Sequence, residues 1–230
     1  MNNNRNLSIK ARTESPLFIK LSHGNKKLKS NDRVSFLIWN LPAVMTCPDA
    51  TENCIHFCYA KKAENVYPAC KPSRLDHFEI SKQGDFIQRM IYTIQVELDR
   101  PKNKNRKVVF RIHESGDFYN KAYVEKWLVI MNHFSDVKNL VFVAYTKSVR
   151  FFDGLALPDN FKLLASVWND TKQSNLDIIA RNNYRIYTAY AGEDLKKAIE
   201  NGFSKCGCAD CAKCGKCWND FTYHICCEIH

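Results

Sequence analysis

The chain has 230 residues, of which 45% are hydrophobic and 25% charged, and its formal charge is +10 at neutral pH. That length supports one sizeable core, and no apolar run reaches the ~20 residues that a bilayer-spanning helix needs. Residues 1–30 are polar and lack the apolar stretch of a secretory signal, so we expect a cytoplasmic protein without a membrane partner.

The first third of the chain combines a polar lead-in, one strand and one helical region. Residues 1–32 are basic and are expected to be weakly ordered. Residues 33–39 read RVSFLIW, the continuous apolar pattern of a buried strand. Residues 41–70 are expected to form a loop that carries cysteines. Residues 75–98 have apolar side chains at helical spacing, and Gly84 is a candidate break within them.

From residue 107 onward, apolar strands alternate with helical segments. The predicted strands are 107–113, 140–145, 161–167 and 184–190, and the predicted helices are 119–134, 174–182 and 192–201. Such alternation indicates right-handed βαβ units and a parallel sheet covered on both faces. With segment 33–39, the pattern predicts an α/β domain over 33–202, either an incomplete TIM-like barrel or an open parallel sheet. Residues 203–230 differ in composition and are expected to form a small cysteine-rich C-terminal appendage.

Eleven cysteines favour metal binding over disulfides in this chain. The number is odd, no export signal is present, and several cysteines lie only one or two residues apart, which disfavours disulfide geometry between neighbours. Thiolates crowded in this way repel one another, and a bound cation relieves that repulsion.

The first cysteine group, Cys47, Cys54 and Cys58, follows the first predicted strand. Three thiolates can hold three irons of a [4Fe–4S] cluster and leave the fourth iron open to a ligand, whereas a closed electron-transfer cluster uses four cysteines. Cys70 is a possible fourth ligand. A zinc site that ties down the loop, with His56 as another ligand, is the alternative.

The second cysteine group lies in the tail, where the ligand candidates are Cys206, Cys208, Cys211, Cys214 and Cys217. Repeated two-residue gaps resemble ferredoxin ligation, so a closed auxiliary iron–sulfur cluster is expected. Zinc is the alternative, although zinc ribbons usually separate their cysteine pairs by a longer loop. Cys226 and Cys227 follow and could complete the site.

Polar residues follow the other predicted strands. They are Glu114, Ser115, Gly116 and Asp117 after the second, Lys147 after the third, and Ser166, Trp168 and Asn169 at the end of the fourth. Because parallel strands end at one edge, we expect these residues and the first cysteine group to surround one ligand site. Taken singly, they could equally be helix caps and ordinary turns.

Several longer strings support a family resemblance. SFLIWNLPAVMTCP, CxxxCYAKKAE, FRIHESGDFYN, AYTKS and the cysteine-rich tail resemble the phage family described as gene product 88-like, over most of the chain from about residue 24.

The position of the first cysteine group is similar to that in the radical S-adenosylmethionine superfamily, although its spacings of six and three residues differ from the usual three and two. That resemblance implies a [4Fe–4S] cluster whose open iron binds S-adenosylmethionine, with residues 114–117 receiving the methionine amino group. It also implies an electron donor such as flavodoxin or ferredoxin.

The positive charge suggests a second class of function, a non-catalytic zinc protein that binds nucleic acid or another polyanion. The lead-in is basic, and Arg100, Lys102, Lys104, Arg106 and Lys107 crowd one loop. Removal of residues 1–30, which contain seven lysines and arginines, is expected to leave the fold intact.

Overall fold

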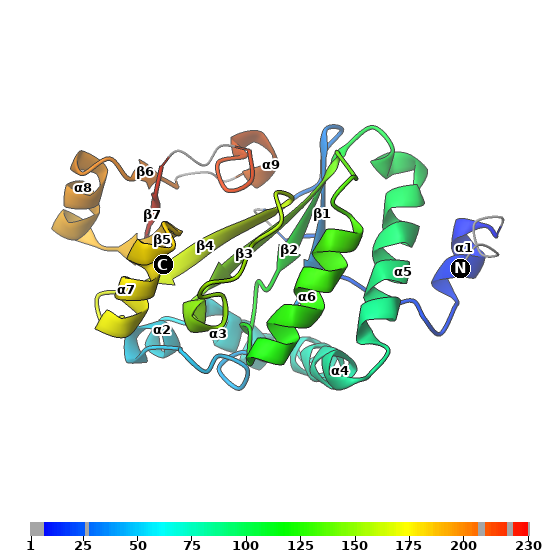
Figure 1. The fold of residues 1–230 in the computed structure, drawn as a ribbon, viewed down its shortest axis with the longest axis horizontal. Coiled ribbons are helices and arrows are strands. Elements are labelled where there is room, and N and C mark those ends of the chain that lie inside the picture. Colours follow the sequence, from blue (N-terminus) through cyan, green and yellow to red (C-terminus); the bar gives the residue numbers. More distant parts are fainter. Residues whose placement is uncertain (1–6, 26–27, 207–209, 220–222, 230) are drawn as a thin grey trace.

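The computed structural model describes residues 7–25, 28–206, 210–219 and 223–229, and their strands form one parallel sheet. The sheet has seven strands in the order β1-β2-β3-β4-β5-β7-β6 and curls into an open half-barrel (Figure 1). The strands are β1 (Val34–Trp39), β2 (Lys107–Ile112), β3 (Leu140–Thr146), β4 (Phe161–Val167), β5 (Arg185–Tyr190), β6 (Ser204–Lys205) and β7 (Ile225–Glu228). The predicted α/β partial barrel is confirmed, and β6 and β7 come from the cysteine-rich tail.

Helices surround this sheet (Figure 1). They are α1 (Ile9–Thr13), α2 (Glu52–His56), α3 (Tyr59–Val66), α4 (Cys70–Lys82), α5 (Phe86–Asp99), α6 (Lys121–His133), α7 (Gln173–Arg181), α8 (Gly192–Glu200) and α9 (Cys211–Cys214). Gly84 separates α4 from α5, as predicted. Among the described residues, no helix has the length and apolar character needed to cross a bilayer.

The expectation of a plain loop over 41–70 is wrong, because α2 and α3 lie within it. Each helix begins at a side-chain cap. The Thr51 hydroxyl accepts a hydrogen bond from the Cys54 amide at 3.3 Å, and the Cys58 thiol accepts one from the Lys61 amide at 3.4 Å. Both caps satisfy amides that lack a partner within the first helical turn. The two helices are short and polar, so their sequences show little helical periodicity.

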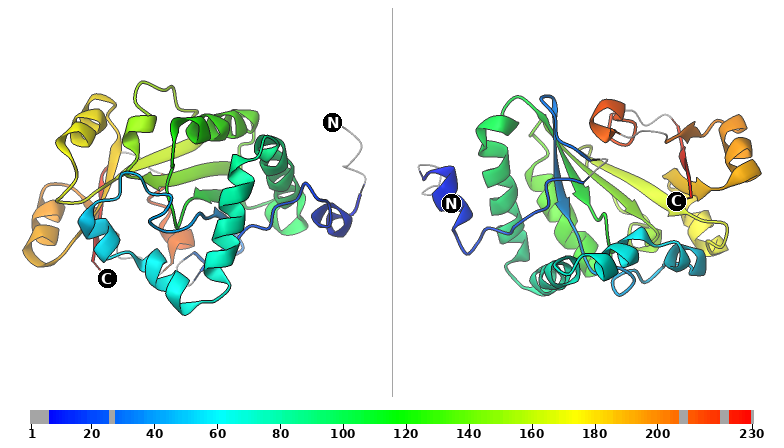
Figure 2. Two further views of the ribbon diagram at one scale, coloured as in Figure 1. Left: turned by 90° about the horizontal axis from the view of Figure 1, so that it is seen from below. Right: turned by 180° about the vertical axis from the view of Figure 1, so that it is seen from behind.

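We call the side of the sheet covered by α5 and α6 the helix face (Figures 1 and 2). Alternate strand residues point to it and build the larger core, which includes Leu37, Trp39, Phe110 and Phe142 with Phe86 of α5 and Trp127 of α6. The Trp39 indole donates a hydrogen bond to the Tyr123 hydroxyl at 2.9 Å, which satisfies a polar group inside this core.

We call the opposite side the tail face, because residues 210–219 pack there (Figure 2). Its apolar residues include Phe36, Ile38, Val109 and Leu164. Trp218 packs edge-on against Phe36, with ring centroids 5.5 Å apart. The tail therefore covers a sheet face that would otherwise expose apolar side chains, and its strand β7 pairs with β5.

The lead-in also contributes to the core. Ile19 and Leu21 are buried, and Ser22 forms an antiparallel bridge with Ile38. The Arg12 guanidinium pairs with Asp99 at 2.7 Å. Removal of residues 1–30, which we expect to leave the fold intact, would therefore lower its stability, since burying each large apolar side chain contributes about 1.5–3 kcal/mol.

The Glu97 carboxylate of α5 is fully buried and joins the lead-in to the basic loop that follows α5. Its Oε2 lies 2.8 Å from Arg100 Nε and 3.2 Å from His23 Nε2. Burial alone would raise the pKa of Glu97, but hydrogen bonds and charges from His23 and Arg100 bring it below the ordinary value of 4.5. The ionised form therefore stabilises the fold above that pH.

We expect Glu97→Gln to lower the free energy of unfolding by about 1.5–3 kcal/mol at neutral pH, because charge-assisted hydrogen bonds are lost. The difference from the wild type should shrink as pH falls through the folded pKa of Glu97, below 4.5, where the wild-type carboxylate takes up its proton. Urea denaturation across pH measures this effect. Glu79→Gln, which removes an exposed ion pair with Lys82, is the control and should change little. Equal losses of unfolding free energy in Glu97→Gln and Glu79→Gln would contradict a stabilising role for the buried Glu97 carboxylate.

Candidate functional site

The first cysteine group lies at the carboxyl edge of the sheet. Cys47 follows β1 in a turn, Cys54 lies in α2, and Cys58 caps α3. Burial raises the pKa of Cys47, and the nearby charges of Asp117, Cys54 and Cys58 raise it further. All three are free thiols. The three cysteines therefore lie in one partly buried region beyond the end of β1.

Lys147, at the end of β3, brings positive charge to these thiols. Burial raises the pKa of Cys54, and the Lys147 ammonium is the largest opposing influence. Burial in turn lowers the pKa of Lys147, and the charges of Cys54 and Asp117 oppose that shift. Lys147 Nζ donates to Ser166 Oγ at 2.8 Å and to the Ser166 carbonyl at 3.2 Å.

Asp117 is the polar centre of the edge between β2 and β3. Its Oδ1 accepts hydrogen bonds from Thr146 Oγ1 at 2.6 Å and from the Phe118 amide at 2.7 Å. Its Oδ2 accepts from the Lys147 amide at 2.9 Å and from Ser148 Oγ at 3.3 Å. These bonds use the acceptor capacity of the carboxylate, so Asp117 positions the strand ends around the thiols.

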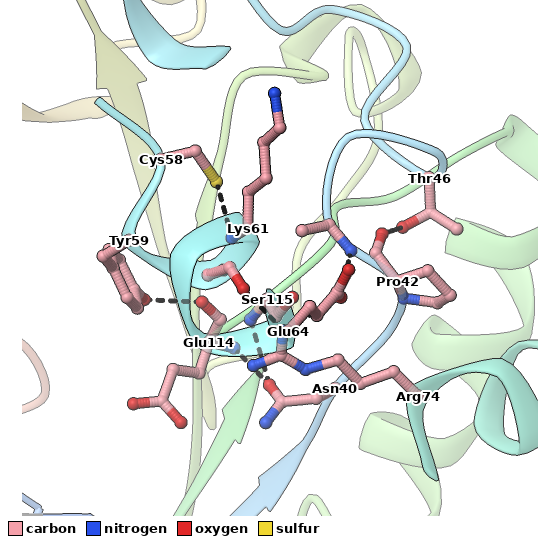
Figure 3. A network of polar contacts seen from close by, with 12 residues as sticks. Asn40, Pro42, Thr46, Cys58, Tyr59, Lys61, Glu64, Arg74, Glu114 and Ser115 are labelled. Carbon is pink, nitrogen blue, oxygen red and sulfur yellow. Dashed lines mark hydrogen bonds and ion pairs between the residues drawn. The ribbon is translucent and has the colours of Figure 1, made fainter. Parts of the chain in front are cut away.

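Glu114 and Ser115 lie where β1, β2 and α3 meet (Figure 3). Asn40 Oδ1 accepts hydrogen bonds from both of their amides, at 2.8 and 3.0 Å. The Tyr59 hydroxyl donates to the Glu114 carbonyl at 2.5 Å. The Glu114 carboxylate accepts a hydrogen bond from Asn25, and Ser115 Oγ is buried without a hydrogen-bond partner among the described residues.

A buried ion pair secures the start of the cysteine loop (Figure 3). Glu64 of α3 pairs with Arg74 of α4 at 2.9 Å, and its Oε1 also accepts the Ala43 amide at 2.8 Å. Arg74 donates a second bond to the Ala60 carbonyl at 3.0 Å. Loss of either partner would leave an uncompensated charge, so this pair fixes the loop on α3 and α4.

The end of β4 holds the other side of the loop. Trp168 stacks on Phe57 with ring centroids 5.7 Å apart, and Lys147 Nζ lies 5.8 Å from the Trp168 ring centroid. Asn53 Nδ2 donates to Asn169 Oδ1 at 2.9 Å. Ser166, Trp168 and Asn169 thus lie close to the cysteine loop or to Lys147.

A cavity of about 320 Å³ opens between the loop and the ends of β3 and β4. Its lining includes Asp49, Thr51, Lys147 and Asp170. A wider cavity of about 540 Å³ lies beside Cys58 and is lined by residues of α2 and α3. Among the described residues, no three His, Cys, Asp or Glu side chains are already arranged around a single metal ion.

Sequence reasoning did not identify Asn40, Tyr59 or Asp170 as part of this edge. Asp170 Oδ2 accepts the Asn53 amide at 2.9 Å and so holds α2 against β4. Asn40 and Asp170 could have been identified, because both are polar residues that follow a predicted strand. Nothing in the local sequence indicates the long-range bond of Tyr59.

The tail cysteines lie elsewhere. Cys206, Cys211 and Cys217 pack against the tail face, and Cys214 ends α9. Cys208, also predicted as a ligand, falls outside the residues that the structure describes. The two predicted cysteine groups are therefore separate in space as well as in sequence.

The fold defines a partial-barrel α/β protein that carries three cysteines close to the edge where its strands end. The Gene product 88 family matches residues 19–220, so the chain belongs to that family. It is similar to the Gene 88 proteins of Mycobacterium phages D29 and L5, at 35% and 32% identity over 105 residues. Those matches cover 44% of this chain and less than half of each relative. No solved structure matches the chain.

Gly116 supplies the first test of how this edge is built. Its φ is +79°, and an added Cβ would lie 2.5 Å from Thr46 Oγ1 and 2.6 Å from Leu41 Cβ. Gly154 has a similar φ of +71° but open space around it. We expect Gly116→Ala to destabilise the protein by about 1–3 kcal/mol more than Gly154→Ala, because only the first overpacks the loop.

Urea denaturation measures that difference. Labelling of the native protein with a thiol reagent should also show faster reaction at Cys47 in Gly116→Ala, because the displaced loop exposes it. The same stability loss in both glycine variants would show that backbone strain alone acts at Gly116.

Proposed function

We propose that this protein is an iron–sulfur enzyme of the radical S-adenosylmethionine type, with its reactive cluster on Cys47, Cys54 and Cys58. The observation that carries the proposal is the shared placement of three thiols at the carboxyl edge of a parallel half-barrel, beside Lys147. Sites of α/β proteins form at this edge because several strand ends converge there.

The residues fit such a group chemically. Burial disfavours the thiolate form of Cys47 and Cys54, and a bound cationic cluster would favour it. Three thiolates leave one iron open, which suits ligand binding rather than electron transfer alone. When bound, the cluster would supply the electron for reductive cleavage of S-adenosylmethionine. An external donor such as flavodoxin or ferredoxin would then return one electron to the cluster.

The chain's own residues would bind and orient the cofactor. Lys147 offers its ammonium to a carboxylate, and Glu114 with Ser115 Oγ offers acceptors to an amino group. Trp168 presents an aromatic ring that could pack on an adenine face. The ion pair of Glu64 and Arg74 keeps the loop in place at the edge.

We expect Cys47→Ala, Cys54→Ala and Cys58→Ala each to lose one cluster's iron and all cleavage of S-adenosylmethionine. Each change removes one of three thiolate ligands. Iron and sulfide content after anaerobic purification, together with formation of 5′-deoxyadenosine under a chemical reductant, measures both effects. Cys70→Ala tests whether this partly exposed thiol at the start of α4 is a fourth ligand, and unchanged iron in that variant would show that three thiolates hold the cluster.

Unchanged iron in all three loop variants would reject the cluster. If the three variants lose iron but the wild type does not cleave S-adenosylmethionine, the protein binds an iron–sulfur cluster and does not use S-adenosylmethionine.

The basic segments support a second candidate function, which is nucleic-acid binding by a non-catalytic zinc protein. The pairing of Arg12 with Asp99 places the lead-in beside the loop that begins at Arg100. Lys102 and Lys104 of that loop are exposed, as is Lys10 of α1. A single basic area therefore forms from segments that are far apart in sequence, and phosphate groups would suit it.

If this candidate is right, the double change Lys102→Ala and Lys104→Ala should weaken duplex DNA binding at low salt. The slope of log affinity against log salt should fall by about 2, because each phosphate contact contributes about one unit. Fluorescence anisotropy over a salt series measures the slope. Lys196→Ala on α8, where the lysine pairs with Glu193, is the control. Absence of binding by the wild type at low salt would remove this candidate.

A further inference from the structure

The exposed aromatic side chains of this protein are concentrated on one short segment. Among the described residues, the largely exposed Phe, Tyr and Trp side chains are Phe57, Tyr59 and Tyr67, with 37%, 56% and 64% of their surface accessible. The other aromatic rings of the described chain are buried or half-buried. Exposed apolar groups that gather in one place mark an interaction surface, whereas single exposed ones do not.

The three rings belong to a row of short helices beside the cysteine loop. Helices α2, α3 and α4 follow one another along the carboxyl edge of the sheet (Figures 1 and 2). Phe57 ends α2, Tyr59 begins α3, and Tyr67 ends α3. Phe57 already stacks on Trp168 of the β4 end, with only 6° between the ring planes. The row therefore presents aromatic rings next to the strand ends.

The exposed charge between these rings is positive. Lys61 and Lys62 are exposed on α3, and neither ammonium forms an ion pair within the part of the chain that the structure describes. Glu64 of the same helix is buried and committed to Arg74. Figure 3 shows the Lys61 side chain extending away from that pair, on the side of Cys58. Both lysines are therefore available to an anionic group.

The cavity of about 540 Å³ lies among these groups. It opens between α2 and α3, and its volume falls within the ~300–1,000 Å³ of small-molecule sites. Its lining residues are Glu52, Ile55, His56, Cys58, Lys61, Lys62 and Asn65. A group held there would touch the two lysines and lie next to one of the three loop cysteines.

Aromatic rings interleaved with unpaired cations match the chemistry of a single nucleic-acid strand. The bases of a single strand stack on exposed rings, and its phosphates contact lysines. A duplex would not use the rings in this way, because its bases are already stacked on one another. A protein or lipid partner would use aliphatic area as readily as aromatic rings, so Val66, which is 65% exposed beside Tyr67, separates these cases.

We propose that the surface formed by Phe57, Tyr59, Lys61, Lys62 and Tyr67 binds single-stranded nucleic acid, with one nucleotide in the cavity beside Cys58. The inference rests on the proposed function in one respect, since it makes the strand the substrate held beside the reactive cluster. The surface is separate from the basic loop of residues 100–106, which precedes β2 and so lies at the opposite edge of the sheet.

Fluorescence anisotropy with a labelled oligothymidylate and a labelled oligouridylate, each about 12 nucleotides long, tests the surface in the full-length protein. Tyr67→Ala should weaken strand binding about tenfold, because one base loses its stacking partner, and Tyr67→Trp should bind like the wild type. Val66→Ala is the matched control, since it removes equally exposed surface without a ring. Equal losses in Tyr67→Ala and Val66→Ala, or no binding of either strand by the wild type, would overturn the proposal.

A salt series tests the lysines. The double change Lys61→Ala and Lys62→Ala should lower the slope of log affinity against log salt by about 1.4, because each phosphate of a single strand contributes about 0.7. Lys196→Ala with Lys197→Ala removes the same charge from α8 and should leave the slope unchanged. Equal changes of slope in the two double variants would show that net charge alone acts, and would overturn the site.

Two further measurements separate this inference from its alternatives. Vesicles of phosphatidylcholine and phosphatidylserine that bind through Tyr67, when neither oligonucleotide binds, would assign the surface to lipid and overturn the proposal. Strand binding is measured without reductant and without S-adenosylmethionine, so it does not depend on the cluster. Strand binding by a protein that lacks iron would support this surface and reject the proposed enzyme, whereas cleavage of S-adenosylmethionine without strand binding would do the reverse.

Discussion

The buried carboxylate of Asp117 holds the edge on which the site is built. It accepts hydrogen bonds from Thr146, the Lys147 amide and Ser148, so the ends of β2 and β3 keep one arrangement. Gly116, immediately before it, leaves room for the loop that begins at Leu41 to lie against the turn. Asp117 and Gly116 thus support the first cysteine group from the side of the sheet, while the Glu64–Arg74 pair holds the start of its loop through the Ala43 amide.

Burial sets the chemistry of the thiols at this edge. A thiolate at Cys47 or Cys54 is disfavoured by desolvation, and Lys147 offsets only part of that cost for Cys54. Burial therefore favours the neutral thiol at both positions, and the ammonium of Lys147 is the largest influence in the opposite direction at Cys54.

Two residues connect the two cysteine groups. Tyr59 follows Cys58 in α3, and the charges of Arg111 and Cys58 both act on its hydroxyl. Arg111 in turn acts on Cys217 of the tail. The carboxyl edge and the tail face are thus linked through the side of β2 that carries Arg111. Arg111 therefore lies between the two groups, on a sheet face whose other residues are largely apolar.

Periodicity and strand-to-loop order are local properties, so they were enough to predict the parallel α/β fold, the split at Gly84 and the position of the first cysteine group after a strand. The sequence also indicated Lys147 and Asp117 as edge residues. It did not predict α2 and α3, whose caps are single side chains, or the core role of Ile19 and Leu21 in a basic lead-in. Local sequence left open which way Cys226 and Cys227 face, because the pairing of β7 with β5 sets that register and turns Cys226 toward α8. Only the tertiary structure brought Arg111 and Tyr59 to one place, because contacts between distant segments leave no pattern in the local sequence.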